Sequence, residues 1–173
     1  LRTDVVFSLS GIEELVIQNK GLILHASYIL KNNKAILFTG PSTIGKSTQA
    51  DLWKKYADAE IINGDKSLIT IKDNEFFAEG IPFSGSSKHC LNESAIIKAI
   101  ICLKKGSENK LTPITSPQSF YSIFRNCYPA GFSKDLTNSL IDFVTELSNR
   151  VPVYEYTCLP DESAVRFLEA NIL

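Results

Sequence analysis

One short stretch of the chain, residues 34–50 (KAILFTGPSTIGKSTQA), has residue types and spacing suited to binding phosphate. It contains the complete pattern G-x-x-x-x-G-K-S, with Gly40, Gly45, Lys46 and Ser47 at its fixed positions. Glycines at the bends allow backbone N–H groups to point inward, and a helix starting near Gly45 would present the positive end of its dipole. The apolar strand before the loop and the helical pattern after it favour a nucleotide-binding loop over an ordinary glycine-bearing turn.

The loop predicts ATP, or another nucleoside triphosphate, together with Mg²⁺ as cofactors. Lys46 would reach the β- and γ-phosphates, and the Ser47 hydroxyl would bind Mg²⁺. The residues expected to contact the nucleotide are Gly40, Pro41, Ser42, Thr43, Ile44, Gly45, Lys46, Ser47 and Thr48.

A candidate carboxylate, Asp65, follows a short apolar strand predicted over residues 60–62. A carboxylate at the end of a strand beside a phosphate loop can hold Mg²⁺, or accept the proton of an attacking hydroxyl. The sequence N-G-D-K is also common turn chemistry, so a structural aspartate is the alternative. The phosphate loop upstream favours the functional interpretation.

A candidate histidine, His25, lies in the sequence LHAS. Most single histidines beside apolar residues are structural, but two strands over 22–30 and 34–39 meet here at Asn32-Asn33, a plausible tight hairpin. The hairpin would bring His25 near the loop end of the next strand. An imidazole at that position can bind a metal or orient a phosphoryl oxygen.

A polar loop within GIPFSGSSK is a candidate for contacts on the acceptor side of the site. Its hydroxyls, backbone N–H groups and one cation could cover a transferred phosphate or position the acceptor. A flexible connection between strands is equally consistent with this composition. The candidate residues are Ser84, Gly85, Ser86, Ser87 and Lys88.

The remaining pattern predicts the elements that must position these groups. Further strands are expected over residues 4–10, 67–72, 75–78, 95–103 (central) and 153–157 (edge-like), and residues 13–18 are read as irregular or strand. Helices are expected from the phosphate loop to about Tyr56, from Ser116, over 134–150, and from 161–162 to the end. We find no repeat or linker, which indicates a single domain.

Composition limits the classes of partner. The 173 residues are 44% hydrophobic and 21% charged with a net charge of −1, which is typical of one globular domain. The lysines form no basic stripe, so nucleic acid and anionic membranes are disfavoured as partners. No apolar run approaches the roughly 18 residues of a membrane span, and no signal peptide is evident. The chain starts at Leu1 and has no methionine, so we expect it to lack its natural start.

The four cysteines are widely spaced and form no C-x-x-C pair, which argues against a zinc site or a disulfide framework. We expect reduced, buried thiols and a cytoplasmic location. They are Cys90, Cys102, Cys127 and Cys158.

The order L-H-A-S, hairpin, A-I-L-F-T-G-P-S-T-I-G-K-S-T and I-N-G-D resembles the HPr kinase/phosphoenolpyruvate carboxykinase superfamily. The later segments GIPFSGSSKHCLNESAIIKAIICLKKGSENKL and RVPVYEYTCLPDESAV are more similar to small HPr-kinase-like serine kinases, some of which are associated with peptide-modification pathways. The resemblance runs from about Gly21 to the C-terminus. The histidine–loop–aspartate order and the I-P-F-S-G segment are more specific than the loop alone.

The resemblance implies an α/β (mixed α+β) fold, in which a mixed sheet with flanking helices forms one HPr-kinase-like nucleotide-binding domain over residues 1–173. It implies Mg²⁺/ATP-dependent transfer of phosphate to a serine hydroxyl of a protein or peptide, and is compatible with a homo-oligomer. His25 takes the active-site histidine position, Lys46 and Ser47 the phosphate and metal positions, and Asp65 the position of the aspartate after the second strand.

The sequence departs from the family at Gly64, where the family usually has the first of two adjacent aspartates. Asp65 must therefore serve as both metal group and base, or transfer activity has been lost. Two alternatives stay open: a kinase for a small hydroxyl-bearing metabolite, and a catalytically weakened nucleotide-sensing module. A carboxykinase is disfavoured because its large N-terminal domain has no room in this chain.

Overall fold

The structure is a computed structural model that describes residues 11–84, 87, 89–128 and 133–173. The predicted strand over residues 4–10 lies outside the described residues. The elements in chain order are α2 (Ile12–Gln18), β1 (Gly21–Leu24), β2 (Ala26–Lys31), β3 (Lys34–Thr39), α3 (Lys46–Ala57), β4 (Glu60–Asn63), β5 (Ser67–Lys72), β6 (Glu75–Glu79), β7 (Ser94–Lys105), β8 (Lys110–Pro113), α4 (Ser116–Phe124), α5 (Lys134–Arg150), β9 (Val153–Cys158) and α6 (Glu162–Ile172).

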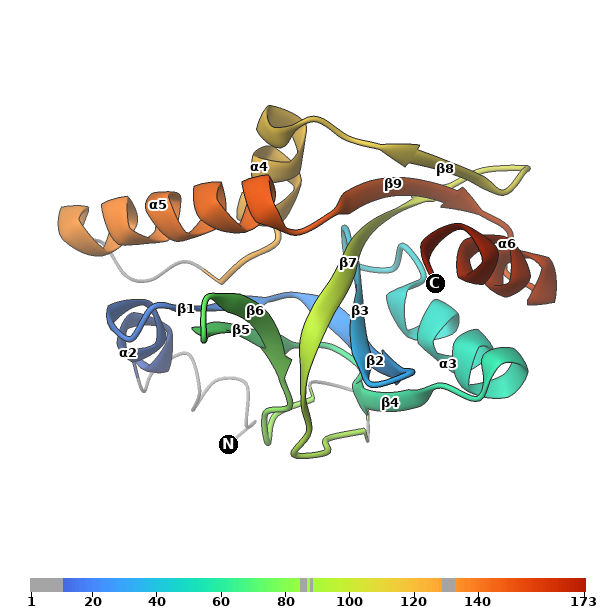
Figure 1. The fold of residues 1–173 in the computed structure, drawn as a ribbon, viewed down its shortest axis with the longest axis horizontal. Coiled ribbons are helices and arrows are strands. Elements are labelled where there is room, and N and C mark those ends of the chain that lie inside the picture. The colour runs from blue at the N-terminus through green and yellow to red at the C-terminus, as the bar shows by residue number, and fades with distance from the viewer. Residues whose placement is uncertain (1–10, 85–86, 88, 129–132) are drawn as a thin grey trace.

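The described strands form one curled, mixed sheet of nine strands around the long strand β7 (Figure 1). β3 and β9 each run parallel to β7, whereas all other strand pairs are antiparallel. The main path is β1-β5-β6-β7-β3-β2-β4, with β9 pairing β7 and β8. Because β3, β7 and β9 are parallel, their carboxyl ends meet at one edge of the sheet.

Helices cover both faces of this sheet and enclose two hydrophobic cores. Along β3, Ala35 and Leu37 face the core shared with α4 and α5, whereas Ile36 and Phe38 face the core shared with α3 and α6. This alternation follows from the two-residue period of a strand. Figure 1 shows α3 and α6 together on one side of β7 and α5 with α4 on the other. The expected mixed α+β architecture with flanking helices is confirmed.

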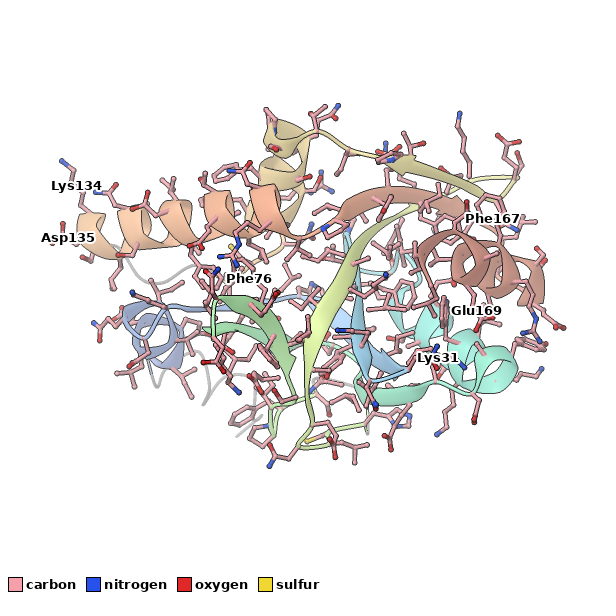
Figure 2. The ribbon with its side chains drawn as sticks, in the orientation of Figure 1. Lys31, Phe76, Lys134, Asp135, Phe167 and Glu169 are labelled. Atoms are coloured by element: carbon pink, nitrogen blue, oxygen red, sulfur yellow. The ribbon has the colours of Figure 1, made fainter. Side chains whose placement is uncertain are left out.

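Side-chain contacts fix the helices against the strands (Figure 2). On one side, Phe76 of β6 meets Phe143 of α5 edge to face, with ring centroids 5.7 Å apart. On the other, Phe167 of α6 stacks on Tyr156 of β9 at 6.1 Å. Aromatic pairs in these geometries add a modest attraction to the burial of their apolar surface.

The predicted hairpin at Asn32-Asn33 is confirmed. Both residues have positive φ values, 51° and 57°, and Lys31 pairs directly with Lys34 across the turn. Two consecutive residues in the left-handed region produce the turn whose twist matches that of the flanking strands. β5 and β6 are joined in the same way through Asp73 and Asn74.

Three local predictions were wrong. Residues 12–18 form helix α2 rather than an irregular segment or a strand. The hydrophobic pattern of so short a segment does not distinguish a helix from a strand, and packing of α2 against β1 and α5 decides the outcome. The segment 22–30 is two strands that are interrupted at His25 and enter different parts of the sheet. β9 is not an edge strand, since the exposed strand β8, which the sequence did not indicate, pairs with its outer side.

The cysteines are less buried than expected. All four are free thiols, but Cys90 is exposed and the other three are half-buried. Among the described helices, none is long and apolar enough to cross a membrane.

The first prediction concerns the core under α5. Leu147 is fully buried there, so Leu147→Ala should lower the free energy of unfolding by about 2–5 kcal/mol in urea titrations. Ile141 on the same helix is 38% exposed, and Ile141→Ala should change it by only about 0.5 kcal/mol. Equal effects of the two substitutions would contradict the orientation of α5.

Candidate active site

The phosphate-loop sequence lies between the end of β3 and the start of α3, at the edge where the parallel strands end. Gly40, Thr43 and Gly45 have φ values of 140°, 64° and 115°, so the loop turns sharply and two of the three positions require the freedom of glycine. Gly45 caps helix α3, whose first residue is Lys46. The loop therefore directs the N-terminal end of a helix, with its unpaired N–H groups, toward the carboxyl ends of the strands.

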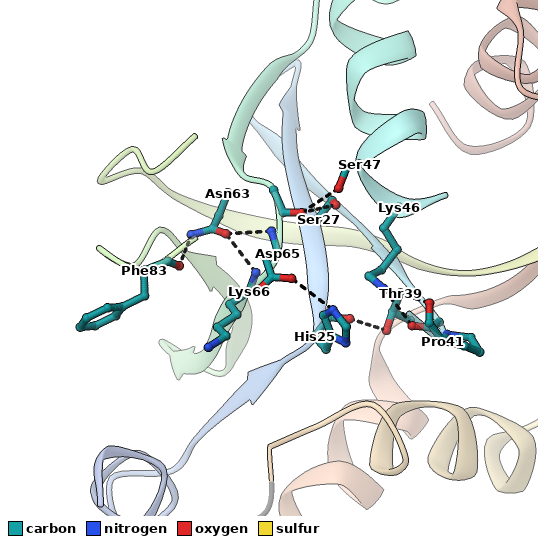
Figure 3. A network of polar contacts seen from close by, with 12 residues as sticks. His25, Ser27, Thr39, Pro41, Lys46, Ser47, Asn63, Asp65, Lys66 and Phe83 are labelled. Atoms are coloured by element: carbon teal, nitrogen blue, oxygen red, sulfur yellow. Dashed lines mark hydrogen bonds and ion pairs between the residues drawn. The ribbon is translucent and has the colours of Figure 1, made fainter. Parts of the chain in front are cut away.

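The Lys46 side chain folds back inside this loop. Its Nζ donates to the carbonyl oxygens of Gly40 and Pro41, both at 3.1 Å (Figure 3). The residue is only 7% exposed, and this burial lowers the pKa of Lys46, while the negative charge of Asp65 opposes the shift. A cation already held inside the loop is well placed to attract a phosphate oxygen there.

His25 and Asp65 are in direct contact, with His25 Nε2 and Asp65 Oδ1 3.2 Å apart (Figure 3). The histidine occupies the break between β1 and β2, where its backbone N–H donates to the carbonyl of Asn126 at 2.8 Å. Its own carbonyl accepts a 2.9 Å hydrogen bond from the hydroxyl of Thr39, the last residue of β3. The histidine is therefore held beside the start of the phosphate loop, as expected from the predicted hairpin.

Asp65 is positioned by the buried amide of Asn63. The Asn63 Oδ1 accepts from the backbone N–H groups of Asp65 and Lys66, at 3.0 and 2.9 Å. Its Nδ2 donates to the carbonyls of Ile81 and Phe83, at 3.1 and 2.9 Å. One side chain thus shapes the turn that carries Asp65 and also holds the I-P-F segment beside it.

The hydrogen bond from His25 lowers the pKa of Asp65 below its ordinary value. Burial opposes this shift, and electrostatic attraction to His25, Lys66 and Lys46 supports it. The carboxylate is therefore ionised at neutral pH and can bind a cation or receive a proton.

The residue before Asp65 connects it to the phosphate loop. The Gly64 carbonyl accepts hydrogen bonds from the hydroxyls of Ser27, at 2.8 Å, and Ser47, at 3.3 Å (Figure 3). A Cβ atom built on Gly64 would lie 2.1 Å from Ser87 Oγ. The space that a side chain at position 64 would need is therefore filled by Ser87.

Ser47 and Asp65 fit the requirements of Mg²⁺, which prefers hard oxygen ligands and usually combines one or two protein groups with substrate phosphates and water. Within the described residues, no group of three or more His, Cys, Asp or Glu side chains converges as a protein-only metal site would require. The pair of oxygen donors beside a phosphate loop suits a metal held jointly with a nucleotide.

The structure also places groups that the sequence did not single out. Lys66 is buried, with its Nζ 4.7 Å from the centre of the Tyr128 ring, and that ring lies 6.4 Å from the His25 ring. Asn63 could have been found from the turn sequence N-G-D, because asparagine commonly bonds to the backbone two residues on. Nothing in the sequence marked Ser27, Lys66 or Tyr128, whose neighbours come from distant segments.

Two of the five acceptor-side candidates are described. The Ser87 N–H donates to the Ser84 carbonyl at 2.8 Å, and the Ser84 hydroxyl donates to the Ser87 carbonyl. These contacts hold Ser84 and Ser87 together beside Gly64. Gly85, Ser86 and Lys88 lie outside the described residues.

Two hollows flank the phosphate loop. The first, of about 360 Å³, lies at the carboxyl ends of β7 and β9 and is lined by Ile44, Gly45, Thr48, Gln49, Leu103, Lys104, Lys105, Gly106, Cys158, Leu159 and Pro160. The second, of about 310 Å³, lies beside Ser47 and Gly64 and is lined also by Ala50, Asp51, Ile61, Ser87 and His89. A larger hollow, of about 1040 Å³, lies between α2 and α5 and includes no phosphate-loop residue. We place the candidate site at the phosphate loop, although its two hollows are smaller, because the candidate residues meet there.

Comparisons with known proteins give a structural likeness only. No protein-family model matches the chain, and no curated protein matches its sequence. Among solved structures, the chain is similar to the Hpr(Ser) kinase/phosphatase from Coxiella burnetii, with 12% identity and a TM-score of 0.48 over 86% of this chain and 91% of that chain. At this level of likeness, the roles of the site residues depend on their own geometry.

The second prediction concerns acid stability. Because the pKa of Asp65 is lowered in the folded state, its ionised form stabilises the fold above the ordinary aspartate pKa of about 3.9, and this contribution is lost as pH falls through the folded value. In urea titrations, Asp65→Asn should be less stable than wild type at pH 7, and the difference should shrink at about pH 3. The exposed Asp142→Asn serves as the control and should show a much smaller difference. A gap that is the same at both pH values would contradict the His25–Asp65 contact.

Proposed function

We propose that the chain is a Mg²⁺/ATP-dependent kinase that transfers a phosphoryl group to a serine hydroxyl of a protein or peptide. The observation that supports this most strongly is the convergence of Lys46, Ser47 and the His25–Asp65 pair at the start of α3. These groups come from three separate segments of the chain. A fold that needed only a stable turn here would not require a buried cation, a carboxylate and an imidazole together.

The phosphate loop and the first hollow bind different parts of the nucleotide. The phosphates bind to the backbone N–H groups of the loop and to Lys46. The nucleoside then occupies the first hollow, whose apolar walls include Ile44, Leu103 and Leu159. This arrangement follows the general preference of ligands for the carboxyl ends of parallel strands.

Ser47 and Asp65 would hold Mg²⁺, which neutralises phosphate charge when bound. In the absence of a second aspartate at position 64, Asp65 also receives the proton of the acceptor hydroxyl. Phosphoryl transfer passes through a loose transition state that needs positioning and charge stabilisation more than a strong base. A carboxylate with a lowered pKa is therefore adequate, and His25 keeps it oriented.

The third prediction tests nucleotide binding. Lys46→Ala removes a charge-assisted contact worth about 1.5–3 kcal/mol, so the affinity for Mg²⁺-ATP measured by calorimetry should fall by about tenfold or more. Lys54 is exposed on the same helix, and Lys54→Ala is the matched control that should bind as wild type. Unchanged affinity in Lys46→Ala would exclude the phosphate-loop assignment.

The fourth prediction tests catalysis. Asp65→Asn is nearly isosteric, so it should retain the fold and much of the ATP affinity while transfer to a serine peptide falls by about 10²–10⁴-fold. Since His25 contacts Asp65 directly, His25→Ala should lower turnover even at saturating Mg²⁺. A histidine that bound the metal would instead raise the Mg²⁺ concentration needed for activity.

Two results would redirect the proposal. Wild-type rates in Asp65→Asn would mean that the base lies elsewhere. Tight ATP binding by the wild type without transfer to any serine peptide or small hydroxyl-bearing metabolite would favour the sensing module.

A further inference from the structure

The close approach of Ser87 to Gly64 brings a serine hydroxyl of the chain itself into the candidate site. A Cβ atom on Gly64 would lie 2.1 Å from Ser87 Oγ and 2.5 Å from Ser87 Cβ, both far shorter than real carbon contacts. Gly64 does not adopt a positive φ, so its backbone conformation does not demand glycine. The absence of a side chain at position 64 is explained by the Ser87 hydroxymethyl group that fills its place.

Local hydrogen bonds hold Ser87 in this position. Its N–H donates to the Ser84 carbonyl at 2.8 Å, and its Oγ accepts from the His89 N–H at 3.2 Å. The Ser84 hydroxyl also donates to the Ser87 carbonyl. These hydrogen bonds define the position of the Ser87 hydroxyl.

That place lies next to the groups proposed for phosphoryl transfer. Ser87, Gly64 and Ser47 line the same hollow of about 310 Å³. The Gly64 carbonyl accepts from Ser47 at 3.3 Å, and the next residue along the chain is Asp65. The hydroxyls of Ser87 and Ser47 thus both lie against Gly64, the residue that precedes the proposed proton acceptor Asp65.

We propose that Ser87 is an autophosphorylation site, on which the chain's own active site acts; this rests on the proposed kinase function. Ser87 Oγ forms a bond to the γ-phosphorus of ATP, and the bond from that phosphorus to the bridging oxygen of ADP breaks. The hydroxyl proton passes to Asp65, and ADP leaves. Atoms and charge balance without any further reactant.

The modification would also alter the site. Phosphoserine carries nearly two negative charges at neutral pH, which would stand beside Asp65 and the phosphates of a second nucleotide. The phosphorylated chain should therefore bind Mg²⁺-ATP more weakly than the unmodified chain.

The test is incubation of the purified chain with Mg²⁺-ATP and no added acceptor, followed by intact-mass measurement and peptide mapping. We expect a gain of one phosphoryl group, located on Ser87, at a rate that is independent of protein concentration. Ser87→Ala should lose it, and Ser139→Ala, which removes an exposed hydroxyl from α5, should keep it. Gly64→Ala should also reduce labelling, because its Cβ would displace Ser87.

The outcomes separate this proposal from the kinase function. Transfer to an added serine peptide with no phosphate on Ser87 would overturn autophosphorylation alone. Phosphate on Ser84 or elsewhere, with Ser87→Ala labelled as wild type, would also overturn it. A wild-type chain that fails to bind Mg²⁺-ATP would overturn both proposals together.

Discussion

The candidate site depends on a single buried amide, that of Asn63. Its side chain satisfies four backbone groups in two segments, and an unpaired polar group in so buried a position would cost about 1–3 kcal/mol. All four hydrogen bonds are kept only if the 63–66 turn and the 81–83 segment hold their positions relative to each other. Because Asp65 lies in this turn, the same hydrogen bonds fix its position.

The interruption at His25 supplies the second half of the site. β1 pairs with β5, whereas β2 pairs with β3 and β4, so the backbone must leave one set of neighbours and join another between them. The residue at the junction cannot use the regular ladder. It bonds instead to Asn126 and Thr39, and its side chain is directed to Asp65. A change of partner within the sheet thus presents an imidazole beside the phosphate loop.

Position 64 shows how a residue without a side chain can shape a site. Ser87 occupies the space beside Gly64, and the Gly64 carbonyl accepts hydrogen bonds from two hydroxyls. Neutral hydroxyl groups therefore surround Gly64 near the proposed metal position. The hydrogen bond from His25, supported by the nearby charges of His25, Lys66 and Lys46, lowers the pKa of the Asp65 carboxyl group.

The sequence by itself determined what depends on near neighbours: the phosphate loop with its glycines, the Asn32-Asn33 hairpin, the central strand, and most helices. These follow from backbone preferences and from periodic burial over a few residues. It also predicted His25 near the loop, because a hairpin fixes register. Tertiary structure alone decided that His25 touches Asp65, that Asn63 holds both segments, and that Ser87 fills the space at Gly64. Those contacts join residues far apart in the chain, and short-range patterns carry no information about which distant groups will meet.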